Sequence, residues 1–297
     1  MPTSLSVLMS VYNKETPEFL RQSLESLGAQ TLPADEIVLV EDGPIGEDLA
    51  SVIASFRASL PILSVKLPVN SGLGIALRAG LDECHGEFVA RMDSDDISVR
   101  RRFEKQFVFL EEHPEVDVVG GAIAEFDDDR STPRAIRRLP ASGASLFKFA
   151  KHRNPLNHMT VMFRKAPVIA AGSYKPCAAF EDYYLWSRML IGGCILHNLE
   201  DILVYARCGN GMQNRRGGLG YVRREIGMEL MLCEMGFLSR IECIRNIAVR
   251  TPVRLIPHQL RALAYRGFLR DAVGSPSTSA VSSVQNIPLA PGQPFHH

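Results

Sequence analysis

Phe88-Val89-Ala90-Arg91-Met92-Asp93-Ser94-Asp95-Asp96 is the most informative stretch of this sequence. It begins as an apolar run typical of a strand, which we expect to stop at Arg91 and Met92, and three carboxylates follow. Ligands of open α/β sheets bind at the carboxyl ends of strands. Acids crowded there repel one another, and a divalent cation such as Mg²⁺ or Mn²⁺ relieves that repulsion. We therefore predict a metal site at Asp93, Asp95 and Asp96; an acidic turn before a helix is the alternative.

Three further apolar runs precede this stretch, at residues 4–11, 36–40 and 62–67, and a helical pattern follows each of them. Alternation of strands and helices predicts an α/β fold with a mostly parallel central sheet, flanked by helices and joined by right-handed crossovers. Polar residues follow these strands at Tyr12, Asp42 and Asn70. We expect them to meet the acidic cluster at one edge of the sheet.

The later patterns complete this unit and add a different one. Helices are expected over 100–112, 221–235 and 239–249, and strands over 116–126, 159–163 and 195–205. We divide the chain into an α/β domain at 1–207, a basic helical region at 208–272 and a disordered tail at 273–297, which is rich in Ser, Pro, Gly and Gln.

A second candidate site begins at Phe180-Glu181-Asp182-Tyr183-Tyr184-Leu185-Trp186, where a helix is predicted to start. Acids at a helix N-terminus lie in a favourable dipole potential, so Glu181 or Asp182 could simply cap the helix. A carboxylate among aromatic side chains could instead have a raised pKa and act as a general base. The sequence alone leaves both open. We interpret Trp186 as a core residue, with a sugar-stacking role as the alternative.

The composition is that of a soluble globular protein, with 46% hydrophobic and 22% charged residues and equal numbers of acidic and basic side chains. The cysteines have no zinc-site spacing, and we expect buried thiols in a reducing compartment. We expect neither a signal peptide nor a membrane span. These features predict a cytoplasmic protein.

The basic helical region contains seven arginines and one acid between Arg240 and Arg270, interleaved with apolar residues. Such a segment is typical of contact with an anionic membrane surface. The alternatives are a surface helix whose arginines pair with acids and, less favoured because no known module is visible, nucleic-acid binding. We expect Pro252 and Pro257 to interrupt any helix here.

Residues 4–205 resemble the family 2 glycosyltransferases of the GT-A fold, in particular those of bacterial exopolysaccharide (amylovoran-type) biosynthesis. The resemblance rests on motifs that are weak singly and specific in this order. They are Val7-Leu8-Met9-Ser10-Val11-Tyr12-Asn13, Val38-Leu39-Val40-Glu41-Asp42-Gly43, Asn70-Ser71-Gly72-Leu73-Gly74, Met92-Asp93-Ser94-Asp95-Asp96 and Phe180-Glu181-Asp182-Tyr183-Tyr184-Leu185-Trp186.

The resemblance implies transfer of a sugar from a nucleotide sugar, by preference a UDP-sugar, to a hydroxyl group, with inversion at the anomeric carbon. Val11 and Tyr12 would frame the nucleobase and Asp42 would accept a hydrogen bond from uracil. Asp93 would contact the ribose and Asp95 the metal that bridges the diphosphate.

Further residues carried over by the resemblance complete the predicted site. Asp96 would assist Asp93 or Asp95. Asp182 would be the catalytic base, with Glu181 beside it, and His158 would line the donor or acceptor pocket. Asn70 belongs to the donor site. Where many relatives have Arg-Asn after the Asn-x-Gly stretch, this chain has Leu77-Arg78, so Arg78 is the candidate for the phosphate contact.

The predicted acceptor is a polyprenyl-diphosphate-linked oligosaccharide, reached from the cytoplasmic face of the cell membrane by a peripherally bound enzyme. Two rival functions were weighed. A nucleotidyltransferase would need a glycine-rich basic loop after the first strand, which Val11-Tyr12-Asn13-Lys14 does not provide. A non-catalytic nucleotide-sugar sensor or scaffold would tolerate loss of the acids near Asp95 and at Asp182, and both are present.

Overall fold

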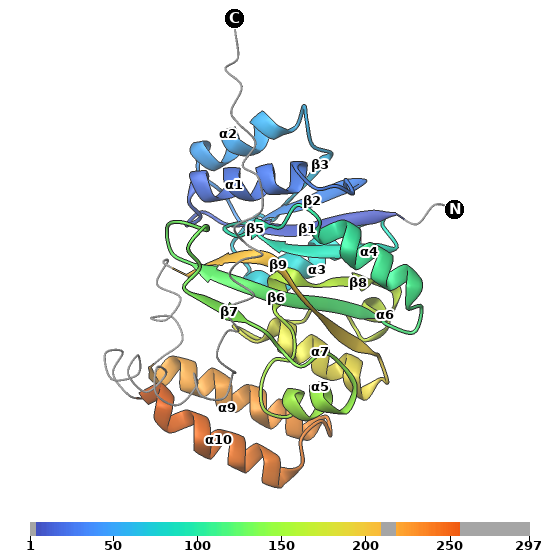
Figure 1. Ribbon diagram of the computed structural model, residues 1–297. Helices are drawn as coiled ribbons and strands as arrows, with labels where there is room; N and C mark the ends of the chain where they lie inside the picture. Colours follow the sequence, from blue (N-terminus) through green and yellow to red (C-terminus); the bar gives the residue numbers. More distant parts are fainter. Residues whose placement is uncertain (1–3, 209–217, 256–297) are drawn as a thin grey trace, which may run out of the picture.

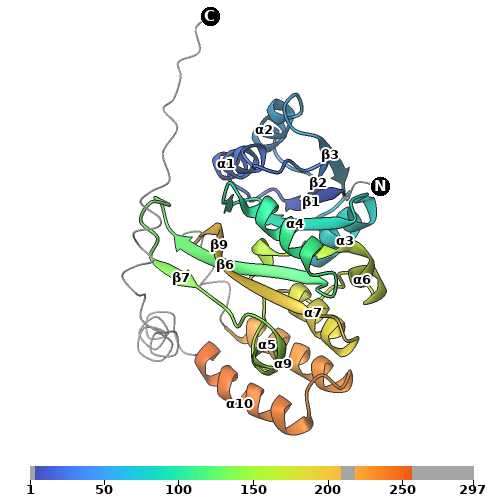
Figure 2. The same ribbon diagram turned by 45° about the vertical axis from the view of Figure 1, so that its right-hand side comes forward.

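The computed structural model describes residues 4–208 and 218–255. Within these ranges a nine-stranded sheet forms the middle of the molecule, and helices cover both faces (Figures 1 and 2). The strands are β1 (Leu5–Val11), β2 (Glu36–Glu41), β3 (Ile62–Lys66), β4 (Phe88–Asp93), β5 (Ile97–Ser98), β6 (Val118–Phe126), β7 (Ala135–Arg137), β8 (Met162–Arg164) and β9 (Leu196–Arg207). The helices are α1 (Pro17–Gly28), α2 (Glu47–Phe56), α3 (Leu73–Glu83), α4 (Arg102–Glu112), α5 (Gly143–Ala150), the 3₁₀ helix η1 (His158–Thr160), α6 (Lys165–Ala170), α7 (Glu181–Ile191), α9 (Leu219–Glu234) and α10 (Arg240–Leu255). The predicted α/β fold class is confirmed.

Half of the sheet is parallel, in the order β3-β2-β1-β4. The register aligns Ser10 of β1 with Val40 of β2 and with Asp93 of β4. Because aligned parallel strands end at the same edge, the loops after β1, β2 and β4 emerge together. This is the edge of the sheet at which the polar residues that follow the strands were predicted to meet.

The other half of the sheet is mixed. β8 runs antiparallel to β4 and to β6, β9 runs parallel to β6, and the short strands β5 and β7 add antiparallel pairs. The expectation that the strand at 88–93 stops at Arg91 was wrong, since β4 continues to Asp93. The Arg91 amide donates to the carbonyl of Val161 at 2.9 Å, which keeps the backbone extended.

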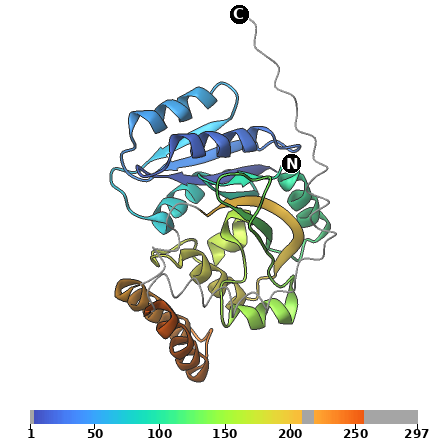
Figure 3. The same cartoon turned by 60° about the vertical axis from the view of Figure 1, so that its left-hand side comes forward.

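Alternate residues of each central strand face two separate cores. Val7 and Met9 of β1 pack with side chains of α1, α2 and α4, whereas Leu8 packs with side chains of α3, α6 and α7. Figure 3 shows helices on both sides of the curved sheet. Trp186 of α7 is fully buried in the second core, which confirms its interpretation as a core residue.

Helices α9 and α10 form a hairpin at the end of the molecule opposite α2 (Figures 1 and 2). A third core joins this hairpin to α5 and α7, through Phe180, Tyr183, Met228, Leu232 and Phe237 among others. Both helices were predicted, but the interruption at Pro252 was wrong because α10 continues through it. Pro252 lacks the N–H that would bond to the carbonyl four residues earlier, and α10 tolerates this loss within the described residues. Pro257 and the predicted tail lie outside the described residues.

Among the helices of the described ranges, none is both long enough and apolar enough to cross a bilayer. All six cysteines are free thiols, but the expectation that they are buried holds only for Cys84 and Cys243. The other four are half-buried, because they lie near the ends of helices and strands or in loops and not in the cores.

Candidate functional site

The structure brings Asp42 and Asn70 together at the carboxyl edge of the parallel strands. The Asp42 carboxylate accepts hydrogen bonds from the amides of Ser71 at 2.7 Å and Gly72 at 3.0 Å. Asn70 Nδ2 donates to both the Asp42 carboxylate and its carbonyl, each at 3.1 Å. A carboxylate has about four acceptor positions, so three of them hold the loop before α3 and one is left for a ligand.

Gly43 allows these two loops to approach each other. Its φ is +83°, and an added Cβ would lie 2.5 Å from the backbone nitrogen of Asn70. A side chain at this position is therefore excluded both by backbone strain and by the neighbouring chain.

Asp93 ends β4 and is paired with Arg91 on the same face of the strand. Nη2 of Arg91 lies 2.6 Å from Oδ1 of Asp93, and the two side chains are 2% and 29% exposed. The Nε and Nη1 atoms of Arg91 are buried without a hydrogen-bond partner. Arg91 is therefore a buried cation whose main partner is an acid of the predicted site.

Arg207, at the end of β9, holds the turn that follows Asp93. Its amide donates to Oδ1 of Asp96 at 2.8 Å, and its Nε donates to the carbonyl of Asp95 at 3.2 Å. The guanidinium lies over the rings of Phe19 and Phe126. One oxygen of Asp96 is thus engaged by the protein itself.

Ionisation of the buried carboxyl groups in the acidic turn is unfavourable, because they lie close to one another and away from water. Burial, together with the charges of Asp93 and Glu15, raises the pKa of Asp95 to about 7. Burial and the charges of Asp93 and Asp95 raise the pKa of Asp96 well above its ordinary value. A cation near these groups would relieve the repulsion.

The donor set fits a hard divalent ion that takes several ligands from a substrate. In residues 4–208 and 218–255, no group of three or more His, Cys, Asp or Glu side chains is arranged to hold a metal alone. Mg²⁺ sites with diphosphate substrates commonly use one or two carboxylates and phosphate oxygens. Asp95 and Asp93 can supply such carboxylates.

Asp182 lies in the first turn of α7 and is held on both of its oxygens. Oδ1 accepts the Tyr183 amide at 2.7 Å, and Oδ2 accepts Nδ2 of Asn154. Burial raises the pKa of Asp182, and the two hydrogen bonds and the charge of Arg91 oppose that rise. The capping interpretation was wrong, because the N-cap of α7 is Phe180 and no side chain caps this helix; Asp182 only accepts the amide of the residue that follows it. The base interpretation is compatible with this geometry.

Two further groups border Asp182. Nδ1 of His158 is 3.9 Å from Asp182 Oδ2, and its Nε2 is 3.0 Å from the Tyr174 hydroxyl. Burial and the charge of Arg91 lower the pKa of His158 well below its ordinary value, so the ring is neutral near pH 7. Burial and the charge of Asp182 raise the pKa of Glu181 to about 7.

Arg91 links the acidic turn to the start of α7. Its charge lowers the pKa of Asp95 and Asp96 on one side and of Glu181 and Asp182 on the other, in each case against the larger effect of burial. Both groups of acids therefore lie within the electrostatic reach of Arg91. The start of α3 also approaches the start of α7 directly, since an added Cβ at Gly74 would lie 3.2 Å from the Cβ of Glu181.

Within the described part of the chain, the remaining predicted residues form no hydrogen bond or ion pair with the four acids near Arg91. Val11 is buried at the end of β1, Tyr12 follows it half-buried, and Arg78 is exposed on α3. Their contacts with a donor stay predictions.

Sequence reasoning missed Arg91, Asn154, Tyr174 and Arg207. Arg91 did carry a signal, because a charged residue inside an apolar strand needs a partner and Asp93 follows on the same face. The others are distant from their partners in the chain and had no local signal.

Comparison with known proteins agrees with the resemblance noted in the sequence. The family described as "Glycosyl transferase family 2" matches residues 6–171. The amylovoran biosynthesis glycosyltransferase AmsE of Erwinia amylovora is 46% identical over 88% of this chain and 97% of its own length. An Escherichia coli protein named UDP-Gal:alpha-D-GlcNAc-diphosphoundecaprenol beta-1,3-galactosyltransferase is 35% identical over 89% of this chain and 96% of its own.

A solved structure shares the architecture. The mannosyltransferase PcManGT of Pyrobaculum calidifontis, determined with GDP-Man and Mn²⁺, has a TM-score of 0.62 at 15% identity, over 96% of this chain and 80% of that one. At this identity the likeness concerns the fold, and it confirms the expected GT-A architecture.

Proposed function

Because the chain belongs to glycosyl transferase family 2, we propose that it transfers a sugar from a UDP-sugar to a polyprenyl-diphosphate-linked oligosaccharide, with inversion at the anomeric carbon. The observation that carries this proposal is the buried Arg91, which lies 2.6 Å from Asp93 and whose charge also favours the ionised form of Asp182. The start of α3, next to the loop that holds Asp42, approaches the start of α7, where an added Cβ at Gly74 would lie 3.2 Å from the Cβ of Glu181. The chain is a glycosyltransferase, so a nucleotidyltransferase or a non-catalytic sensor is no longer favoured.

The donor end of the site is formed by the loops after β1, β2 and β4. Val11 and Tyr12 would border the base, and the free acceptor position of Asp42 would receive the uracil N–H. Asp93 would bind the ribose, and Asn70 and Arg78 would complete the donor site. The ion pair of Asp93 with Arg91 supports its role, because it fixes the direction of the carboxylate.

Asp95 and Asp93, assisted by Asp96, would hold Mg²⁺ or Mn²⁺ with the donor diphosphate. The ion would supply positive charge that offsets the charge of the departing nucleoside diphosphate. The raised pKa of Asp95 supports this assignment, because burial near other acids is unfavourable without a cation.

Asp182 would accept the proton of the attacking hydroxyl group. Each of its oxygens is held by one hydrogen bond, which leaves acceptor capacity for a substrate proton. Burial already raises its pKa, as suits a general base near neutral pH. Glu181 and His158 border the same space and would contact the donor or the acceptor sugar.

The lipid-linked acceptor and a role in exopolysaccharide synthesis are supported by the names of the two similar enzymes. Such an acceptor requires a cytoplasmic enzyme bound peripherally at the inner face of the membrane. Support for membrane contact comes from α10, where Ile241, Ile244 and Val249 are 81%, 68% and 64% exposed. They fall on one side of the helix.

Contrary to the expectation that the arginines of α10 contact a membrane, two of them are paired within the protein. Nη1 of Arg250 is 2.7 Å from Glu229, and Nε of Arg254 is 3.2 Å from Glu225, so both pair with acids of α9. The alternative in which arginines pair with acids thus holds for these two. Arg240 and Arg245 are exposed and would be the charges that face anionic lipids.

Calorimetry with a panel of nucleotide sugars, with Mn²⁺ and again with chelator, tests the donor. We expect one UDP-sugar to bind only with metal, and the same donor to glycosylate a polyprenyl-diphosphate-linked acceptor with inversion. Binding of no nucleotide sugar, together with no transfer to that acceptor, would contradict the proposal.

A further inference from the structure

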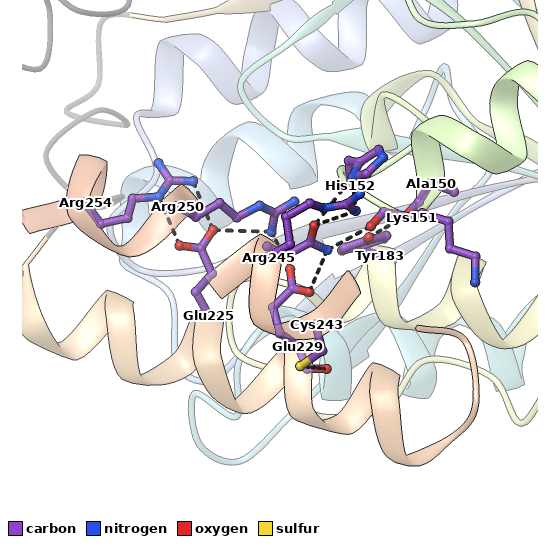
Figure 4. Close-up of polar contacts among 11 residues, drawn as sticks. Ala150, Lys151, His152, Tyr183, Glu225, Glu229, Cys243, Arg245, Arg250 and Arg254 are labelled. Carbon is purple, nitrogen blue, oxygen red and sulfur yellow. Dashed lines mark hydrogen bonds and ion pairs between the residues drawn. The ribbon is translucent and has the colours of Figure 1, made fainter. Parts of the chain in front are cut away.

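Segment 150–154 is hydrogen-bonded both to the α9–α10 hairpin and to Asp182. Figure 4 shows the contacts on the hairpin side. It follows α5 and leads into the loop before η1. Its contacts form a continuous path from a peripheral helix to the candidate base.

On the hairpin side, the path begins at Asn246 of α10, which is 4% exposed. Its Nδ2 donates to the carbonyl of Lys151 at 2.8 Å and to Oε2 of Glu229 at 3.0 Å. Glu229 is fully buried, and Arg250 holds its other oxygen at 2.7 Å. Asn246 is therefore fixed by a buried ion pair, and it fixes the segment in turn.

Three other contacts hold the same segment. The Lys151 ammonium donates to the carbonyl of Phe237, between the two hairpin helices. Arg245 donates to Nδ1 of His152 at 2.7 Å. The Tyr183 hydroxyl donates to the carbonyl of Ala150, which ties the segment to α7 as well. Figure 4 shows Arg245 and Tyr183 reaching residues 150–152.

On the site side, the path ends at Asn154. Its Oδ1 accepts the Leu156 amide at 3.2 Å, which fixes the orientation of the side-chain amide. Nδ2 then points to Oδ2 of Asp182 and donates to it. The carboxylate direction therefore depends on where segment 150–154 lies.

We propose that Asn154 is a positioning residue for Asp182 and that Asn246 positions Asn154 through segment 150–154, so that the hairpin takes part in the geometry of the catalytic centre. The inference rests on the proposed role of Asp182 as base. A catalytic group misplaced by about 1 Å can cost about 10²-fold in rate. Neither asparagine needs to touch a substrate for its loss to slow transfer.

Two variants, Asn154→Ala and Asn246→Leu, test the path, and Ser239→Ala is the matched control. Ser239 caps α10, where its Oγ accepts the Glu242 amide at 3.2 Å and its own amide donates to Glu242. The substitution weakens the same helix, and Ser239 itself makes no hydrogen bond with segment 150–154. It leaves in place Glu242, whose carboxylate lies 3.8 Å from Nζ of Lys151.

In transfer assays we expect kcat to fall about 10²-fold in Asn154→Ala and about tenfold in Asn246→Leu, with the donor KM unchanged. The acid limb of the kcat profile should move to higher pH in Asn154→Ala, because a hydrogen bond to the ionised form is lost. Ser239→Ala should keep the wild-type kcat. Equal effects of Asn246→Leu and Ser239→Ala, or a wild-type kcat in Asn154→Ala, would overturn the inference.

Amide hydrogen exchange, measured by NMR, tests the same hydrogen-bonded path without an activity assay. The Tyr183 amide is held by Asp182, so its exchange should accelerate in Asn154→Ala and Asn246→Leu and not in Ser239→Ala. An unchanged rate in both asparagine variants would overturn the inference, even if the wild-type protein proved to transfer no sugar. The exchange measurement therefore distinguishes failure of the hydrogen-bonded path from failure of the proposed transfer function.

Discussion

Nη2 of Arg91 lies 2.6 Å from Oδ1 of Asp93, and both residues point to the same face of β4. Arg91 is buried with two further N–H groups unsatisfied. A buried cation with orphaned donors stabilises a fold poorly. Its position is better explained by the acids around it, which include Asp95 and Asp182.

Arg91→Met should therefore separate stability from activity. We expect the free energy of unfolding to change by less than about 2 kcal/mol, because the desolvated charge is removed and Asp93 can still reach water. The pKa of Asp182 should rise once the cation is lost, so the acid limb of kcat should move to higher pH. Denaturant unfolding and a pH–rate profile measure the two effects; a large loss of stability with an unchanged profile would assign Arg91 to the fold.

Asp182→Asn removes the proposed base and keeps the shape of the side chain. We expect kcat to fall by about 10²–10⁴-fold, the usual contribution of general-base catalysis. Metal-dependent donor binding should stay within about twofold of wild type, a difference of about 0.4 kcal/mol in binding free energy. The reason is that the proposed donor contacts lie at the ends of the parallel strands and do not involve Asp182. Single-turnover rates and calorimetry measure the two, and full activity of the variant would show that another group is the base.

The sequence predicted those parts of the site that follow from local rules. Asp42 and Asn70 could be placed together because each follows a strand of the parallel half of the sheet, and such strands end at one edge. Glu181 and Asp182 were recognised because they begin a helix. In both cases a short pattern determines where the backbone leads.

Contacts between residues that are distant in the sequence could not be predicted from such local patterns. Asn154 reaches Asp182 only because α5 and α7 pack together in the third core, and nothing near Asn154 indicates this. Arg207 meets Asp96 because β9 ends beside the acidic turn. The mixed half of the sheet escaped prediction for the same reason, since strand order there depends on packing and not on alternation of strands and helices.

Gly43→Ala should disrupt the contact between the loops after β2 and β3. Its φ of +83° and the 2.5 Å approach of an added Cβ to the Asn70 nitrogen both oppose a side chain. We expect a loss of about 1–3 kcal/mol in stability and weaker UDP binding, because Asp42 would shift. Gly46→Ala is the matched control: Gly46 is the N-cap of α2 with an ordinary φ of −68°, and nothing lies within 4 Å of its added Cβ, so we expect only the smaller loss that alanine causes at an N-cap and no change in UDP affinity. Equal denaturation midpoints and UDP affinities for the two variants would refute the argument.

The exposed face of α10 should bind membranes through its apolar residues as well as its charge. Burying one isoleucine fully is worth about 1.5–3 kcal/mol, so Ile241→Ser with Ile244→Ser should lower partitioning onto anionic vesicles by at least about tenfold. Val108→Ser on α4, which removes an exposed apolar side chain far from the hairpin, is the control. Arg250→Gln should leave partitioning unchanged, because Arg250 is paired with Glu229 within the hairpin. Sedimentation with phosphatidylglycerol vesicles measures all three, and equal binding of the isoleucine variant and wild type would remove α10 from the membrane contact.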